Sequence, residues 1–205
     1  MTGVQTCALP ICRWFDGTGA ASAVRDVGIR DGRVAAVSAR PLPAPPPPGR
    51  DIDATGRWVL PGFVDMHTHY DAEVLLDPGL GESVRHGVTT VVMGNCSLST
   101  VHAGPVDCAD LFARVEAVPR ELILDALTEN RTWTSAAEYV AALDERPLGP
   151  NVAFLIGHGT VRGSVLGAEA RAPTADELRA MVGEVEAAIE AGAIGLSMNR
   201  DRKSV

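Results

Sequence analysis

The feature of this sequence that most constrains its fold is a change of pattern at Pro61-Gly62. After it, short apolar runs at residues 63–66, 88–93, 152–156 and 194–197 alternate with longer segments. Segments 111–127, 135–143 and 174–191 carry helical periodicity, and the last opens with a Thr-x-x-Glu capping box at Thr174 and Glu177. Strands that alternate with helices are typical of βα units around a parallel sheet. The sequence therefore predicts an α/β fold over residues 61–200.

The number of predicted strands narrows the architecture. A (β/α)8 barrel has eight strands and typically about 250 residues, whereas residues 61–200 offer four strand-like runs. We therefore expect a partial, TIM-like (β/α)8 barrel that consists of about the first four βα units.

Residues 13–60 carry a different pattern, which predicts a small β-domain. Residues 26–38 contain two strand-like stretches separated by Asp31-Gly32, a strong signal for a hairpin turn. Residues 41–49 (PLPAPPPPG) supply few backbone donors and favour extended geometry, so we expect a surface loop. A ligand for a proline-binding protein is the alternative. Residues 51–60 return to a strand pattern with a turn at Thr55-Gly56.

The two ends of the chain do not share these patterns. Residues 1–12 (MTGVQTCALPIC) show neither alternation nor a helical period, and residues 201–205 (DRKSV) look similar. We expect both to be non-native extensions that lie outside the fold. A disordered native terminus is the alternative reading.

Composition excludes several classes of protein. The formal net charge is −8 and Lys and Arg form no clusters, which argues against a nucleic-acid partner. No apolar run approaches the roughly 20 residues of a membrane-spanning helix, and no secretory signal precedes the patterned region. The four cysteines, Cys7, Cys12, Cys96 and Cys108, have neither the spacing nor the density of a disulfide-stapled domain. We therefore expect a cytoplasmic protein.

A histidine pair follows the first predicted barrel strand. In Val64-Asp65-Met66-His67-Thr68-His69, residues two apart on a strand point to the same side, so His67 and His69 can present their rings to one ion. A bare His-x-His has little specificity, and a chance pair on a solvent-facing strand is the alternative. Because active sites of such barrels lie where strands end, the context favours metal ligation.

Cys96 is the candidate third ligand. It follows the second predicted strand in Gly94-Asn95-Cys96-Ser97, which places its thiol at the same end of the sheet as the histidines. A buried structural cysteine is the alternative, since free cysteines often behave as small apolar residues. A thiol beside Zn²⁺ loses its proton readily, and the resulting thiolate is a common ligand.

His158 follows the third predicted strand between Gly157 and Gly159, so we expect it to face the mouth of the pocket. It is a candidate for substrate binding, and a hydrogen bond to a neighbouring loop is the alternative. His86 precedes Gly87 at a predicted helix end, where capping is its expected role.

Five motifs between Trp14 and Met198 resemble those of one known family: DGTG at 16–19, DGRV at 31–34, DATG at 53–56, PGFVDMHTH at 61–69 and GVTTVVMGNC at 87–96. They resemble the N-acyl-D-amino-acid deacylases, or D-aminoacylases, of the amidohydrolase superfamily. The resemblance implies a small β-sandwich beside a metal-bearing barrel, with residues 13–60 as part of the sandwich. It implies one or two Zn²⁺ ions, with His67, His69 and Cys96 as ligands, and a small N-acyl amino acid as substrate.

Two other functions remain as alternatives. Cyclic-amide hydrolases such as dihydroorotases and hydantoinases share the His-x-His but usually bridge two metals with a carboxylated lysine. The only lysine here is Lys203, in the doubtful tail, so this bridge has no candidate. A non-catalytic barrel module is the second alternative, and the joint presence of the three candidate ligands weighs against it.

The resemblance also implies residues that this sequence does not contain. The family's remaining ligands are histidines on later strands, and its general acid/base is a later aspartate. No histidine follows His158, and neither Asp176 nor Asp201 matches that aspartate. We therefore expect no general acid/base in this chain, an incomplete site, and no turnover. In the intact enzyme a zinc ion would activate water for attack on the amide.

Overall fold

The computed structural model describes residues 7–199 and divides them into two compact units between Pro61 and Gly62. The break falls at the Pro-Gly pair where the sequence pattern changes. Within the described residues, no helix is both long enough and apolar enough to cross a membrane.

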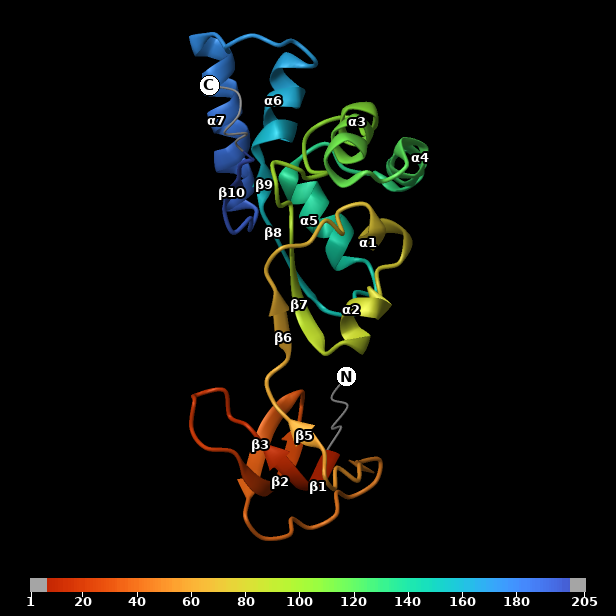
Figure 1. Cartoon of the computed structure of the whole chain (residues 1–205), viewed down its shortest axis with the longest axis vertical. Coiled ribbons are helices and arrows are strands. Elements are labelled where there is room, and N and C mark those ends of the chain that lie inside the picture. Colours follow the sequence, from red (N-terminus) through yellow and green to blue (C-terminus); the bar gives the residue numbers. More distant parts are fainter. Residues whose placement is uncertain (1–6, 200–205) are drawn as a thin grey trace. The chain divides into compact units, whose positions relative to one another are not determined.

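The first unit is a five-stranded β-sheet (Figure 1). Its strands are β1 (Cys7–Trp14), β2 (Ala23–Arg30), β3 (Arg33–Ser38), β4 (Arg50–Asp51) and β5 (Trp58–Val59). The order is β3-β2-β1-β4, and β5 also pairs with β1. The predicted β2–β3 hairpin is confirmed, because Asp31 and Gly32 adopt φ values of 50° and 72° as a tight primed turn requires. The proline-rich segment forms no strand.

The expectation that residues 1–12 lie outside the fold is wrong for residues 7–12, which belong to β1. This strand pairs antiparallel with β2 and parallel with β4 and β5. A register shift between Leu9 and Cys12, with Ile11 at φ 53°, interrupts the strand and removes the alternation that sequence analysis looks for. The non-native origin of the segment stays a prediction. Residues 1–6 and 200–205, including the predicted tail, lie outside the described residues.

The second unit is built on parallel strands, as predicted. β6 (Phe63–Asp65), β7 (Val88–Met93) and β8 (Asn151–Phe154) form one sheet, and β9 (Ile156–Gly157) pairs with β10 (Leu196–Ser197). The predicted strand 152–156 is thus split at Leu155, whose backbone N–H donates to Met93 at 2.9 Å. β7 presents Val91, Val92 and Met93, all buried, as a strand covered on both faces must.

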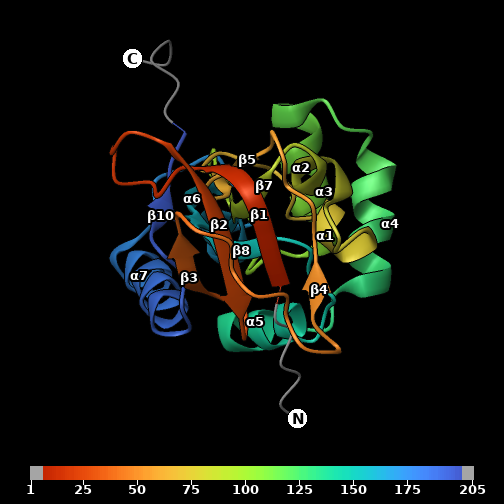
Figure 2. The same cartoon turned by 90° about the horizontal axis from the view of Figure 1, so that it is seen from below.

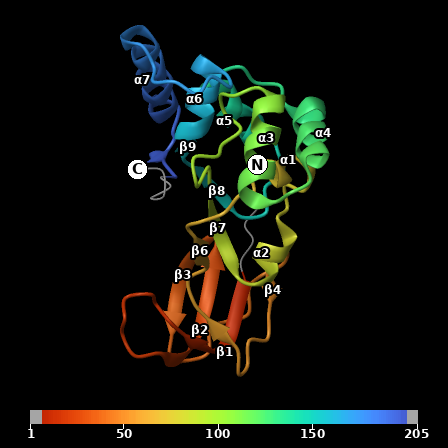
Figure 3. The ribbon, with the colours of Figure 1, turned by 45° about the horizontal axis from the view of Figure 1, so that its top comes forward.

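Seven described helices flank these strands (Figures 1 and 2). They are α1 (Glu73–Leu76), α2 (Gly81–Arg85), α3 (Pro105–Glu116), α4 (Arg120–Asn130), α5 (Ala136–Asp144), α6 (His158–Leu166) and α7 (Ala175–Glu190). The single helix predicted over 111–127 is wrong, because Ala117 turns left-handed at φ 53° and Pro119 follows it. The helices on either side of this break, α3 and α4, pack side by side (Figure 3).

One apolar core holds the second unit together. It joins β7 to the helices through side chains such as Met93, Phe112 and Leu127, all buried. The Tyr139 ring lies at its centre, 5.1 Å from Trp133 and 5.2 Å from Phe154 between ring centroids, in edge-to-face geometry. The strand ends that carry the candidate ligands are therefore anchored in a rigid interior.

The capping box predicted at the start of α7 is confirmed. The Thr174 hydroxyl accepts from the Glu177 backbone N–H at 3.3 Å, and the Glu177 carboxylate accepts from the Thr174 N–H at 2.7 Å. We expect Thr174→Ala to lower the free energy of unfolding by about 1 kcal/mol, because the Glu177 backbone N–H loses its ordered partner. Urea denaturation followed by circular dichroism measures this change. The exposed Thr132→Ala serves as control, and equal effects of the two substitutions would contradict the capping role.

Candidate metal centre

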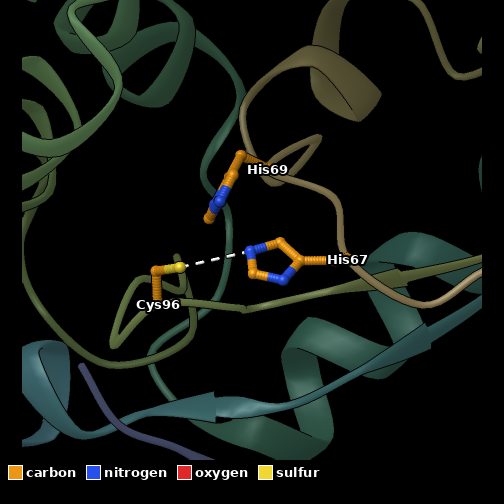
Figure 4. Close-up of side chains that lie close together, drawn as sticks. All are labelled: His67, His69 and Cys96. Carbon is orange, nitrogen blue, oxygen red and sulfur yellow. Dashed lines mark hydrogen bonds between the residues drawn. The ribbon is translucent and has the colours of Figure 1, made fainter. Parts of the chain in front are cut away.

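The structure brings His67, His69 and Cys96 together at the ends of two neighbouring parallel strands. The histidines follow β6 and the cysteine follows β7. One candidate ligand atom from each residue lies within 4.8 Å of the other two (Figure 4). His67 Nε2 lies 3.2 Å from Cys96 Sγ, and the two imidazole rings are 5.3 Å apart at 70°. The predicted proximity of the three side chains is therefore confirmed.

Hydrogen bonds to the end of β7 hold the histidine loop in place. Thr68, between the two histidines, donates to the Val92 carbonyl from its backbone N–H at 3.1 Å and from its hydroxyl at 2.8 Å. The Asn95 side-chain amide donates to the same carbonyl at 2.9 Å. Both loops are thus tied to one backbone oxygen, which fixes the histidine pair relative to the cysteine.

Asp71 adds a second tie between the same two loops. Its side chain is 1% exposed, and one carboxylate oxygen accepts from the Gly94 backbone N–H at 3.1 Å. The other oxygen has no hydrogen-bond partner among the described residues. Burial raises the pKa of Asp71 to about 7, although the Gly94 N–H opposes the shift. The Asp71 carboxyl group therefore contributes to the site by holding the turn that leads to Cys96 in place.

The turn between β7 and Cys96 requires an unusual backbone. Gly94 has φ 78°, and a Cβ atom there would lie 2.0 Å from the Leu155 carbonyl oxygen. Cys96 and Ser97 also have positive φ values, 52° and 68°, which are uncommon for residues with a side chain. Such strain persists where the surroundings fix it. Here Ser197 Oγ accepts from the Ser97 N–H at 3.2 Å and Ser97 O accepts from Gly159 N–H at 3.1 Å.

His69 has the most enclosed ring of the pair. Its Nε2 lies 3.3 Å from a Glu116 carboxylate oxygen, whereas its Nδ1 is buried without a hydrogen-bond partner among the described residues. Burial lowers the pKa of His69; the Glu116 carboxylate acts against this shift and His67 adds to it. The neutral ring, which is the form that binds metals, is therefore favoured.

This donor set fits a transition-metal ion. Two imidazole nitrogens and one sulfur are the ligand types that tetrahedral Zn²⁺ sites use. An unpartnered buried nitrogen on His69 costs free energy unless something binds it.

His158 is not part of this cluster. It is the first residue of α6 and lines a cavity of about 250 Å³ with apolar side chains of α6, α7 and β10, such as Val161, Met181 and Leu196. Sequence analysis did not expect α6, because glycines at 157, 159 and 163 disfavour a helix.

Cys108 and Glu116 both lie in α3 and have different roles. Cys108, which carried no sequence pattern, is buried, and burial raises its pKa to about 12. Sequence analysis missed Glu116, since nothing in a sequence pattern links the end of a helix to a histidine far away in the chain.

The sequence profile of the amidohydrolase family matches residues 50–204. The chain therefore belongs to the amidohydrolase family. Within this family it falls in the D-aminoacylase branch, because its similarity to deacylases extends over nearly the whole chain.

An uncharacterized protein of Mycobacterium tuberculosis is 58% identical over 189 residues, which cover 90% of this chain and 31% of the relative. A crystal structure of D-aminoacylase superposes with a TM-score of 0.76 at 34% identity, covering 94% of this chain and 38% of that chain. The N-acyl-D-glutamate deacylase from Bordetella bronchiseptica, complexed with zinc and a phosphonate inhibitor, superposes with a TM-score of 0.75 at 34% identity over 96% and 38% of the two chains. The chain spans about a third of the length of these curated relatives and of the deacylases that it matches.

The crowded turn at Gly94 generates a prediction. We expect Gly94→Ala to lower the free energy of unfolding by about 2 kcal/mol or more, because the added Cβ meets a carbonyl oxygen and the left-handed φ is strained. Since the turn positions Cys96, Zn²⁺ affinity should fall as well. Calorimetry and metal titration measure the two effects.

Gly183→Ala is the matched control. Gly183 lies inside α7, and nothing lies within 4 Å of the position that an added methyl group would take. Alanine there should raise stability by up to about 1 kcal/mol, because it favours the helix more than glycine does. A Gly94 variant as stable as this control would contradict the close approach.

Proposed function

We propose that this chain contributes part of the active site of a metal-dependent hydrolase that cleaves the amide of N-acyl-D-amino acids. The observation that carries the proposal is the meeting of His67, His69 and Cys96 at the carboxyl ends of β6 and β7. The deacylase names of the similar proteins support the reaction and the substrate class.

The parallel strands support a more specific architecture. We propose that the second unit is the first half of a (β/α)8 barrel and that the first unit is part of a β-sandwich. Every strand pair in the described part of the second unit is parallel, and the candidate ligands lie at the strand ends where such barrels carry their sites.

Each candidate ligand has a defined part in holding the ion. His67 and His69 supply neutral imidazole nitrogens, and Cys96 supplies a sulfur that loses its proton beside a cation. When bound, Zn²⁺ lowers the pKa of a coordinated water toward about 7 and polarises a carbonyl group. The chain itself contributes rigidity, since Thr68 and Asn95 tie both loops to Val92 and reduce the cost of ordering the ligands.

Three further expectations stay predictions. The first is substrate binding by His158, which would require the substrate to reach the cavity between α6 and α7. A cytoplasmic location, which the cysteine pattern favours, is the second. The third is the absence of turnover by these residues alone, because the sequence offers no match for the family's catalytic aspartate and no histidine after His158.

Metal binding is the first test. We expect the purified, reduced chain to bind Zn²⁺, and His67→Ala, His69→Ala and Cys96→Ala each to weaken the affinity about 10-fold or more, because each removes a ligand. Competition with a chromophoric chelator measures the affinity. In the Co²⁺ form, Cys96→Ala should also abolish the thiolate charge-transfer band.

His86→Ala is the control for these variants, since His86 is exposed and lies outside the cluster. Equal Zn²⁺ affinity of the three ligand variants and this control would refute the metal site.

Turnover is the second test. We expect a full-length relative to release carboxylate from N-acetyl-D-amino acids with Zn²⁺ present, and the 205-residue chain to release none under the same conditions. Hydantoins and dihydroorotate belong in the same substrate panel. Preferred hydrolysis of these cyclic amides by the relative would favour the cyclic-amidase alternative, and turnover by the 205-residue chain would refute the expected lack of activity.

A further inference from the structure

We infer that Ser197 is a positioning residue that holds Cys96 in place for metal binding, because its hydroxyl group bridges the two ends of the turn that carries the thiol. The inference rests on the proposed metal site. Ser197 lies on β10, far from Cys96 in the sequence, and it is buried. A third strand end would therefore contribute to the cluster, besides the ends of β6 and β7 that carry the ligands.

The turn that carries Cys96 has a backbone conformation that most side chains disfavour. The Leu98 backbone N–H donates to the Asn95 carbonyl oxygen at 2.9 Å. Cys96 and Ser97 are therefore the two central residues of a β-turn. Both have positive φ values, 52° and 68°, as in a type I′ turn, whose central positions are usually Gly, Asn or Asp. Since neither residue favours this conformation, contacts from outside the turn must stabilise it.

One hydroxyl group supplies such contacts on both sides of Cys96. Ser197 Oγ accepts from the Ser97 backbone N–H at 3.2 Å and donates to the Gly94 carbonyl oxygen. Within the described part of the chain, the Ser97 N–H makes no direct hydrogen bond to that carbonyl. The hydroxyl group therefore takes the place of a backbone hydrogen bond across residues 94–97, and both backbone groups gain a partner.

Neighbouring contacts fix the end of β10 beside the turn. β10 pairs parallel with β9, and Ser197 lies opposite Gly157. A Cβ atom on Gly157 would lie 2.4 Å from the Ser97 carbonyl oxygen, so β9 passes close to the turn. Just after β10, the Asn199 backbone N–H donates to Ser97 Oγ at 2.6 Å. The Ser197 hydroxyl is thus held in place by a strand pairing and by a further hydrogen bond to the same turn.

The conformation of the turn determines where the Cys96 sulfur lies. In the left-handed conformation Cys96 Sγ is 3.2 Å from His67 Nε2, and a change of φ would redirect the Cα–Cβ bond and move the sulfur. The histidine loop has a separate support, since Thr68 donates to the Val92 carbonyl oxygen. Loss of the Ser197 hydroxyl should therefore weaken the metal cluster through the sulfur ligand.

Ser99 offers a matched control. It is fully buried, its hydroxyl accepts from the Gly157 backbone N–H at 3.2 Å, and its Oγ lies 2.7 Å from the Thr160 hydroxyl oxygen. Among the described residues, its side chain makes no hydrogen bond to residues 94–97. Ser99→Ala thus removes a buried hydroxyl group from the same region without opening the bridge. A general loosening of the strand ends would appear in both variants, whereas positioning of Cys96 requires Ser197.

The first measurement follows the turn by NMR in the whole 205-residue chain without metal. Ser197→Ala should speed hydrogen exchange of the Ser97 amide about 10-fold, because this N–H loses its acceptor. It should also change the backbone chemical shifts of Cys96, which report φ. Ser99→Ala should leave both close to the values of the unsubstituted chain.

The second measurement follows the metal. Ser197→Ala should weaken Zn²⁺ binding about 10-fold and reduce the thiolate charge-transfer band of the saturated Co²⁺ form, because the sulfur is no longer held in place. Ser197→Thr, which keeps the hydroxyl group, should lie closer to the unsubstituted chain in both respects. Ser99→Ala should change neither.

The outcomes separate the two proposals. Unchanged exchange of the Ser97 amide and unchanged Cys96 chemical shifts in Ser197→Ala would overturn the role of Ser197 while leaving the metal site intact. Equal losses of Zn²⁺ affinity in Ser197→Ala and Ser99→Ala, or in Ser197→Ala and Ser197→Thr, would also overturn it. If the unsubstituted chain bound no Zn²⁺, the proposed function would fail, and the measurements without metal would still decide whether Ser197 holds Cys96 in its turn.

Discussion

The candidate site depends on one backbone oxygen, the carbonyl of Val92 at the end of β7. It accepts hydrogen bonds from the Thr68 N–H, the Thr68 hydroxyl and the Asn95 amide. These bonds join the loop that carries the histidines to the loop that carries the cysteine. Since Val92 is buried in a strand covered on both faces, the core that stabilises β7 also determines the distance between the rings and the sulfur. Loss of packing around Val92 would therefore also disturb the geometry of the candidate ligands.

The floor of the site is made of backbone rather than side chains. Besides Gly94 under Leu155, a Cβ on Gly157 would lie 2.4 Å from the Ser97 carbonyl oxygen, so the ends of β7 and β9 approach each other closely. Ser197, on β10, reaches across to the same region and bonds the Gly94 carbonyl oxygen through its hydroxyl. The ends of β7, β9 and β10 thus meet without bulky residues between them. The candidate ligands His67, His69 and Cys96 follow directly after such strand ends.

Features that depend on interactions between neighbouring residues were predicted correctly from the sequence. The Asp31-Gly32 turn, the bounds of β7 and the capping box at Thr174 are set by neighbouring residues, and all three are confirmed. The proximity of the candidate ligands followed from strand geometry, since parallel strands end at the same edge. Features that depend on distant partners were missed. Strand residues 7–12 are held by pairing with β2 across a bulge. The break at Ala117 requires a left-handed backbone conformation that alanine rarely adopts. The Glu116–His69 contact joins two segments that are far apart in the sequence through tertiary packing alone.

The different burial of the cysteines separates their reactivity toward dissolved reagents. Cys12 and Cys108 are fully covered, and burial raises the pKa of both thiols, so neither offers an accessible thiolate. Cys96 is partly open, and its sulfur lies beside an imidazole. An alkylating dye or a peroxide would therefore react with this sulfur before the other two. This candidate ligand atom is thus the site at which a reporter could be attached and, among these three cysteines, the position most vulnerable to oxidative damage.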